Sequence, residues 1–276
     1  MIVSIALERY GPLTVAAART TLGALALFSV CQVMGVKLPV KTPKLWRFVI
    51  PIGVLSTALP FFLLSWGQQY VPSAFAGVTM TAVPLFVMPL AHLFSDERMT
   101  VRGVLGVILG FTGAAVLIGP GIFAAGSGDL EPIARIACLC AALAYAVSSV
   151  ATRRCPPINP LALATLSLTV GSVVLIPLML INEGLPTWNG PRSGLAIVFL
   201  GLMPTALATL IRMQVIRSAG SNFLSLVNYQ VPVWSMVFGA VVLSEALPFR
   251  FFVALAMILS GLVVSQWSSL KALAKR

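Results

Sequence analysis

Charged residues are scarce in this chain, and their scarcity excludes a soluble domain. Of its 276 residues only 9% are charged, whereas 59% are hydrophobic, and the mean hydropathy is +1.01. About a quarter of the residues of a soluble globular domain are charged. The composition therefore indicates a polytopic membrane protein. We expect it to be all-α, because a chain in lipid must satisfy its own backbone hydrogen bonds.

The residue patterns of common catalytic and metal sites are also missing. His92 is the single histidine, and Cys138-x-Cys140 lacks the spacing of a zinc site. The chain contains no P-loop, no G-x-S-x-G and no H-E-x-x-H. We therefore expect no metal, no cofactor and no direct use of ATP. An intramembrane enzyme and a membrane receptor are the alternative hypotheses from other functional classes.

Long apolar segments are what the chain has instead, and Pro, Gly and charged residues separate them. A helix needs about 20 apolar residues to cross the hydrocarbon core. On this basis the sequence predicts nine complete transmembrane helices, over residues 12–33, 47–68, 72–94, 100–119, 133–152, 160–181, 194–215, 221–243 and 249–268.

The sequence contains an internal repeat, in which the second copy follows the first with an offset of 148 residues. The offset places Pro84 on Pro232, Glu97 on Glu245 and Gly113 on Gly261, among other identities. We therefore expect two repeats, 1–128 and 129–276. Residues 1–9 align with the end of a full helix of the second repeat, so we expect that most of a first helix is missing here, and a protein of nine helices is the alternative. The complete fold would hold ten helices, five in each repeat.

An odd number of helices per repeat reverses the orientation of the second repeat in the membrane. Inverted-topology repeats are typical of secondary transporters, whose substrate sites lie near mid-bilayer between the two halves. The sequence thus predicts transport by alternating access.

The net charge is +11, and the placement of the basic residues indicates how the chain is oriented in the membrane. If the linker with Lys37 is cytoplasmic, alternation places most basic residues inside, as the positive-inside rule requires. The outside keeps Arg9, Arg19, Arg135, Arg192 and Arg250 with most of the acids. We expect a cytoplasmic C-terminus, a lipid bilayer as the surroundings and no nucleic-acid partner.

Two segments carry a resemblance to a known family. Residues 83–119 and 231–267 each contain a proline-bearing helix, a short link with a glutamate and a glycine-bearing helix. This pair resembles the EamA domains of the drug/metabolite transporter superfamily, over essentially the whole chain. The resemblance implies a carrier of ten helices in the bacterial inner membrane, often an exporter of amino acids or related metabolites. The missing first helix departs from the family pattern.

Polar residues within the apolar spans are the candidates for substrate binding. Three of them, Asn228, Tyr229 and Gln230, precede Pro232, and their matching positions before Pro84 include Met80 and Thr81. Tyr145 and Ser148 are further cavity candidates by position and polarity. Arg212 either reaches the headgroups by snorkelling or faces a carboxylate-bearing substrate. Hydrogen bonding between helices is the alternative role for the polar residues.

Two prolines and two acids occupy equivalent places in the repeats. Pro84 and Pro232 lie within helices, where a proline frees the carbonyl one turn earlier and kinks the helix. We expect these kinks either to shape a binding site or to serve packing. Glu97 and Glu245 lie in links, where each carboxylate can stabilise the start of the next helix.

These observations together predict a secondary transporter that exports small metabolites. Amino acids with aromatic or apolar side chains are the favoured substrates, because an apolar cavity discriminates weakly between similar side chains. A multidrug carrier and a nucleotide-sugar carrier of the same superfamily are the alternatives. The sequence predicts a monomer and leaves a dimer open.

Overall fold

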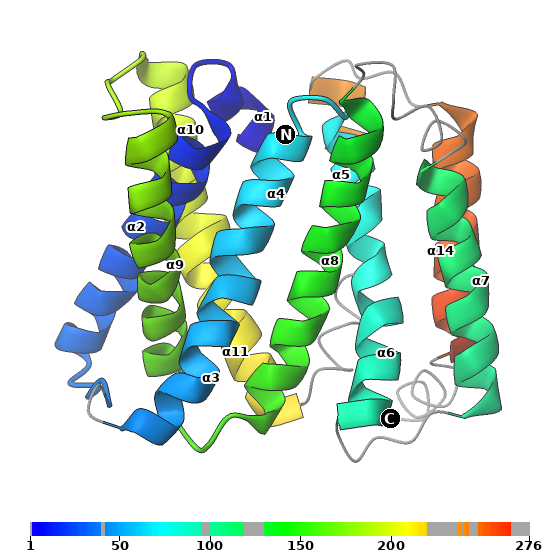
Figure 1. Cartoon of the computed structure of the whole chain (residues 1–276), viewed down its shortest axis with the longest axis horizontal. Helices are drawn as coiled ribbons and strands as arrows, with labels where there is room; N and C mark the ends of the chain where they lie inside the picture. Colours follow the sequence, from blue (N-terminus) through cyan, green and yellow to red (C-terminus); the bar gives the residue numbers. More distant parts are fainter. Residues whose placement is uncertain are drawn as a thin grey trace.

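Apolar helices running between two opposite ends make up the protein in a computed structural model (Figure 1). The structure describes residues 2–39, 42–94, 100–118, 130–219 and 248–265, together with residues 234, 237–238 and 240–242. Within these residues all regular secondary structure is helical.

The helices follow the chain in the order of their labels. The first half contains α1 (Ile2–Leu7), α2 (Pro12–Val33), α3 (Pro43–Gly53), η1 (Val54–Ala58), α4 (Leu59–Gly67), α5 (Ser73–Thr79), η2 (Met80–Ala82), α6 (Val83–Phe94) and α7 (Val101–Ile118). The second half contains α8 (Glu131–Arg154), α9 (Pro160–Asn182), α10 (Pro191–Leu200), η4 (Gly201–Leu207), α11 (Ala208–Ala219) and α14 (Phe249–Ser265).

Eight of the nine predicted spans coincide with helices in the described residues. Six helical segments are long and apolar enough to cross a membrane: Pro12–Val33, Pro43–Gly67, Ser73–Phe94, Glu131–Arg154, Pro160–Asn182 and Pro191–Ser218. Val101–Leu117 and Phe249–Ser265 are shorter apolar helices at the places of two further spans. The all-α polytopic prediction is confirmed, and most of the ninth span, 221–243, lies outside the described residues.

Helix starts follow from local sequence. Pro12, Pro160 and Pro191 each occupy the first turn of a helix, where a proline costs no hydrogen bond and its fixed φ suits the helix. At two helix ends the next turn contains a glycine with positive φ, Gly35 at 65° after α2 and Gly184 at 79° after α9. A residue with a side chain rarely adopts this conformation.

A π-helical segment interrupts the same helix in each half. The segment η1 covers residues 54–58, and the offset of 148 carries it to 202–206, inside η4. Such widened turns leave backbone groups less regularly paired and are frequent at functional sites. Thr57 and Thr205 are equivalent residues within these two segments.

The offset of 148 also exchanges contacts between α2 and α9. A Cβ atom added to Gly23 would lie 3.2 Å from Leu168, and one added to Gly171 would lie 3.2 Å from Thr20. Adding 148 turns Gly23 into Gly171 and Thr20 into Leu168, so each contact is the image of the other. As the residue number rises on one helix it falls on the other, which means that the two helices are antiparallel.

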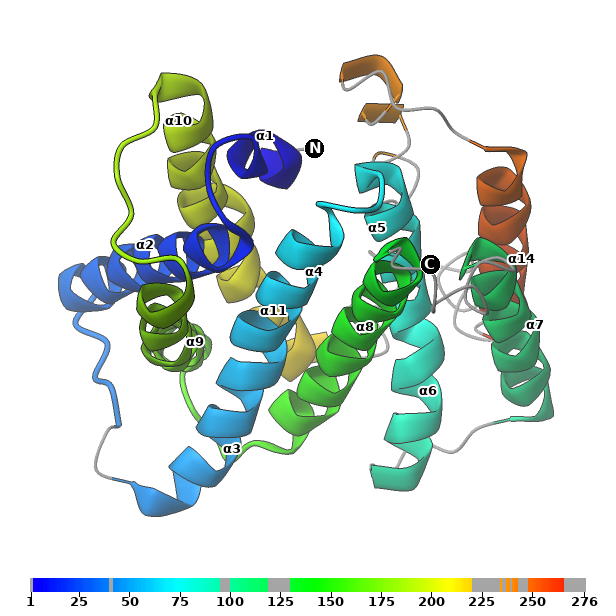
Figure 2. The ribbon, with the colours of Figure 1, turned by 45° about the horizontal axis from the view of Figure 1, so that its top comes forward.

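The same exchange relates α7 and α14, which lie side by side at one edge of the molecule in both ribbon views (Figure 2). A Cβ on Gly113 would lie 3.0 Å from the carbonyl oxygen of Ala254, and a Cβ on Gly261 would contact that of Gly106. These pairs are again images under the offset, and their numbering runs in opposite directions. A pseudo-two-fold axis across the helices therefore relates the two halves, which have inverted orientations.

The described acids lie at one end of the helices, together with some basic residues, and the other end carries basic residues alone among the described charges. The end where α2 finishes and α3 begins carries basic residues, among them Lys37, Lys44, Arg153 and Arg154. The described acids lie at the other end: Glu8, Glu131 and Glu183. By the positive-inside rule we expect the first end to face the cytoplasm.

Thiol labelling of intact cells tests this orientation. A membrane-impermeant maleimide is expected to label Leu185→Cys, on the acidic end, and to leave Lys37→Cys unlabelled until the membrane is opened. Both parent residues are exposed. The chain without an added cysteine is the control for labelling of the natural thiols. Of these, Cys155 is expected to react slowly, because burial raises the pKa of its thiol, with Arg217 opposing the shift, and a protonated thiol reacts slowly. If only Lys37→Cys were labelled in intact cells, the protein would have the opposite orientation in the membrane.

Candidate functional site

Arg212 on α11 binds two of the other predicted residues, Tyr145 and Ser148. Its Nη2 donates to the carbonyl oxygen of Tyr145 at 3.2 Å, to Ser148 Oγ at 2.7 Å and to Ser149 Oγ at 2.9 Å, all on α8. The guanidinium also lies 5.4 Å from the centre of the Tyr145 ring. Ser149 was not among the predicted residues, although it lies one position after Ser148.

The direction of the Arg212 side chain separates its two predicted roles. Tyr145, Ser148 and Ser149 lie in the interior of α8, whose last residue is Arg154. Arg212 therefore binds inward along α8, and it does not extend to the helix end as snorkelling would require.

Met80 and Thr81 have different surroundings. Met80 packs in a cluster with Val83, Val87, Ala142, Ala146 and the Tyr145 side chain. Thr81 is fully buried, and its hydroxyl donates to the carbonyl of Val78. The 3-10 turn η2, Met80–Ala82, interrupts the helix directly before Pro84.

The remaining predicted site residues lie outside the described residues. They are Asn228, Tyr229, Gln230 and Pro232 of the span 221–243, and the link residues Glu97 and Glu245.

Arg19 is a buried cation that the sequence reasoning misplaced. We counted it with the charges of the outer end, but its side chain belongs to α2 and only 7% of the residue is exposed. Its Nε donates to Thr205 Oγ1 at 3.0 Å, and its guanidinium lies 3.9 Å from the centre of the Phe61 ring. The available signal was an arginine at the eighth position of an apolar span, because a charge at that depth is usually functional.

Tyr145 interacts with both arginines. The interaction is electrostatic in each case, and Tyr145 also packs against the cluster between α2, α4 and α9 that contains Phe61. Arg19 and Phe61 come from the first half of the chain, whereas Tyr145, Thr205 and Arg212 come from the second. The site is therefore built at the junction of the two inverted halves.

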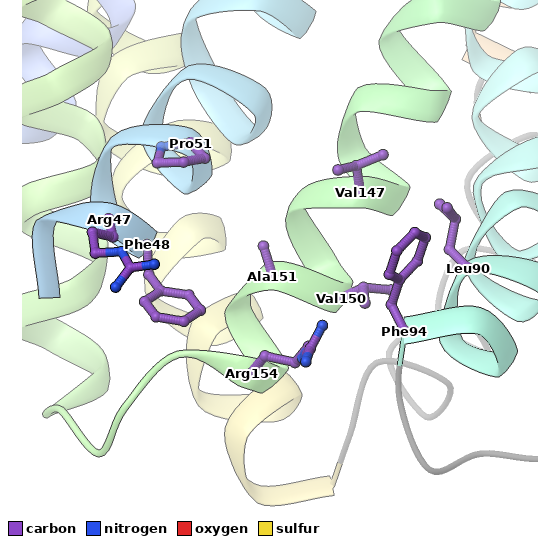
Figure 3. Close-up of a pocket in the computed structure, with 9 residues that line it drawn as sticks. All are labelled: Arg47, Phe48, Pro51, Leu90, Phe94, Val147, Val150, Ala151 and Arg154. Atoms are coloured by element: carbon purple, nitrogen blue, oxygen red, sulfur yellow. The ribbon is translucent and has the colours of Figure 1, made fainter. Parts of the chain in front are cut away.

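A cavity of about 320 Å³ lies on another face of α8, between α3 and α6 (Figure 3). Its residues on α8 are Val147, Val150, Ala151 and Arg154. At 3.6 residues per turn these fall opposite Tyr145, Ser148 and Ser149. Its lining is mainly apolar, and its charged members, Arg47 and Arg154, are both exposed. We place the candidate site at the buried Arg19 and the partly buried Arg212, because this cavity holds none of the grouped polar residues.

Comparison with known proteins decides the family. The model of the EamA-like transporter family matches residues 1–119 and 132–267, which together cover most of the chain. The chain belongs to the EamA-like transporter family. Its fold is also similar to that of a solved crystal structure, with a TM-score of 0.72 at 23% identity over 99% of this chain and 92% of the other.

Several proteins similar to this EamA-like transporter are named as transporters. An uncharacterized transporter of Archaeoglobus fulgidus is 25% identical over 92% of this chain and 88% of its own length. The uncharacterized inner membrane transporter YedA of Escherichia coli is 27% identical, with coverage of 95% and 84%. A "Probable terminal-alkyne amino-acid exporter" of Streptantibioticus cattleyicolor is 28% identical, with coverage of 89% and 81%.

Proposed function

We propose that this EamA-like transporter is a secondary carrier that exports amino acids, with aromatic and apolar side chains favoured. The observation that carries the proposal is the position of the arginine and tyrosine cluster between two halves of opposite orientation. Rocking of one half against the other exposes such a junction to each side of the membrane in turn. A solute bound there would cross without passing through lipid.

The surroundings of the cluster support an amino acid as the solute. Phe61 lies against the Arg19 guanidinium and Tyr145 against that of Arg212, and Met80 packs in the same apolar cluster as Tyr145. Such groups suit an apolar side chain and discriminate little among similar ones. The name of the Streptantibioticus relative, an exporter of an amino acid, points the same way.

The multidrug alternative is less well supported by the described residues. A carrier of organic cations needs a negative group at the depth of its site, because a desolvated cation otherwise has no partner. No Asp or Glu among the residues that the structure describes is buried. The buried charges in the site are positive, which favours a solute with a negative group.

Counterflow in proteoliposomes tests the proposed function. Vesicles that contain the protein and unlabelled phenylalanine or leucine are expected to accumulate the labelled amino acid transiently, above the level in protein-free vesicles. A panel that includes polar amino acids and a cationic dye gives the substrate range. Accumulation of the dye with no counterflow of any amino acid would replace this proposal by a multidrug carrier.

A further inference from the structure

Arg19 keeps most of its hydrogen-bonding capacity unused although it is buried. Its Nε is bound to Thr205, but neither of its two terminal amino groups has a hydrogen-bond or ion-pair partner among the described residues. Only 7% of the residue is exposed to solvent. A buried guanidinium without an acid is costly, because the lost hydration of the charge is not replaced.

The other half of the protein shows that the packing here does not require an arginine. The offset of 148 places Ser167 at the position of Arg19, and Thr57 at the position of Thr205. Around Ser167 the same helix crossing forms with Thr57 Oγ1 at 3.5 Å from the Ser167 carbonyl oxygen. A small neutral residue thus suffices for this crossing in one half. The arginine in the other half calls for a different explanation.

Tyr145 and Arg212, whose guanidinium lies 5.4 Å from the Tyr145 ring centre, also carry donors without a partner among the described residues. The Tyr145 hydroxyl has no hydrogen-bond partner among the described residues, and the same is true of Nε and Nη1 of Arg212. Tyr145 interacts electrostatically with both guanidinium groups. The stack on Phe61 and the bond to Thr205 hold the Arg19 fork in one orientation. The group is rich in donors and positive charge, and no described acid neutralises it.

We propose that Arg19, together with Tyr145 and Arg212, binds the carboxylate group of the transported solute. The planar guanidinium presents paired N–H donors that match the two oxygens of a carboxylate. A buried site of this kind selects for a carboxylate and against its neutral amide or a cation. The inference deepens the proposed function and rests on it for transport, but carboxylate binding can be measured without transport.

The test compares an acid with its amide on the purified full chain. Phenylalanine and phenylpropionate are expected to raise the melting temperature of the wild-type protein. Phenylalaninamide is expected to bind at least about tenfold more weakly than phenylalanine, because charged hydrogen bonds are lost. Arg19→Ser, which copies the other half, is expected to fold and to lose this preference. Arg19→Lys is expected to keep a reduced preference, because it retains the charge without the fork.

The control is Arg192→Gln, which removes a cation whose side chain is exposed and paired with Glu8, and it is expected to keep the preference of the wild type. Equal binding of acid and amide by the wild type would overturn the inference and leave an amino-acid carrier standing. An unchanged preference in folded Arg19→Ser or Arg19→Lys would also overturn it. A carboxylate preference without counterflow of any amino acid would instead contradict the proposed function and keep the binding site.

Discussion

Gly261→Val is expected to disrupt the packing of α7 against α14 and to lower the melting temperature of the protein strongly. A Cβ atom at Gly261 would lie 2.6 Å from the backbone nitrogen of Gly110 and closer still to the carbonyl oxygen of Gly106. Backbone atoms cannot rotate away as the end of a side chain can, so the two helices must separate. Small residues that allow close backbone approach are a main source of association between membrane helices.

The expected destabilisation of Gly261→Val is about 3 kcal/mol, the upper part of the range for overpacked cores. Thermal unfolding in detergent, followed by loss of a monodisperse elution peak, measures it. Val263→Leu is the control, because Val263 is two residues away on α14 and 41% exposed, so its added methylene extends from an exposed side chain. Equal melting temperatures for the two variants would show that the close approach of α7 and α14 contributes little.

The spans and the repeat could be predicted from sequence because both depend on local or periodic signals. Apolar segments of about 20 residues report membrane spans directly, and matched residues such as Pro84 and Pro232 report the register of the repeat. The register then has a three-dimensional counterpart, since the contacts of Gly23 and Gly171 are exchanged by the same offset. Orientation of the halves followed from the odd number of helices in each repeat.

The centre of the candidate site could be predicted only in part. Tyr145, Ser148 and Arg212 were chosen as polar residues in apolar spans, and the structure brings these three together. Arg19 was missed because its partner Thr205 is 186 positions away, and no local pattern joins the two. The π-helical segments were also missed, because a helix that is apolar on every side has no amphipathic pattern in which the extra residue of a π turn would show as a shift.

Another pairing that the sequence did not predict joins the ends of α2 and α9. Glu183, at the end of α9, accepts hydrogen bonds from the backbone nitrogens of Leu13 at 2.9 Å and Thr14 at 2.8 Å. In the other half the equivalent nitrogen, that of Leu161, donates to Asn159 at 2.9 Å. The residue equivalent to Asn159 is Gly11, which has no side chain, so a carboxylate from the second repeat caps the helix of the first.

Glu183→Ala is therefore expected to destabilise the fold by about 2 kcal/mol, because two amides at the positive end of α2 lose a charged acceptor. Glu183→Gln keeps an acceptor and is expected to cost about half as much. Asn182→Ala is the control, since Asn182 is exposed and its side chain bonds, among the described residues, only to Leu178 of its own helix. Thermal unfolding of the three variants gives the order of their stabilities.

A cap supplied across the repeats also ties the start of α2 to α9. Glu183→Ala is therefore expected to speed amide exchange at Leu13 and Thr14 and to leave the Leu161 amide protected by Asn159. Equal exchange at Leu13 and Thr14 in Glu183→Ala and wild type would contradict the capping role.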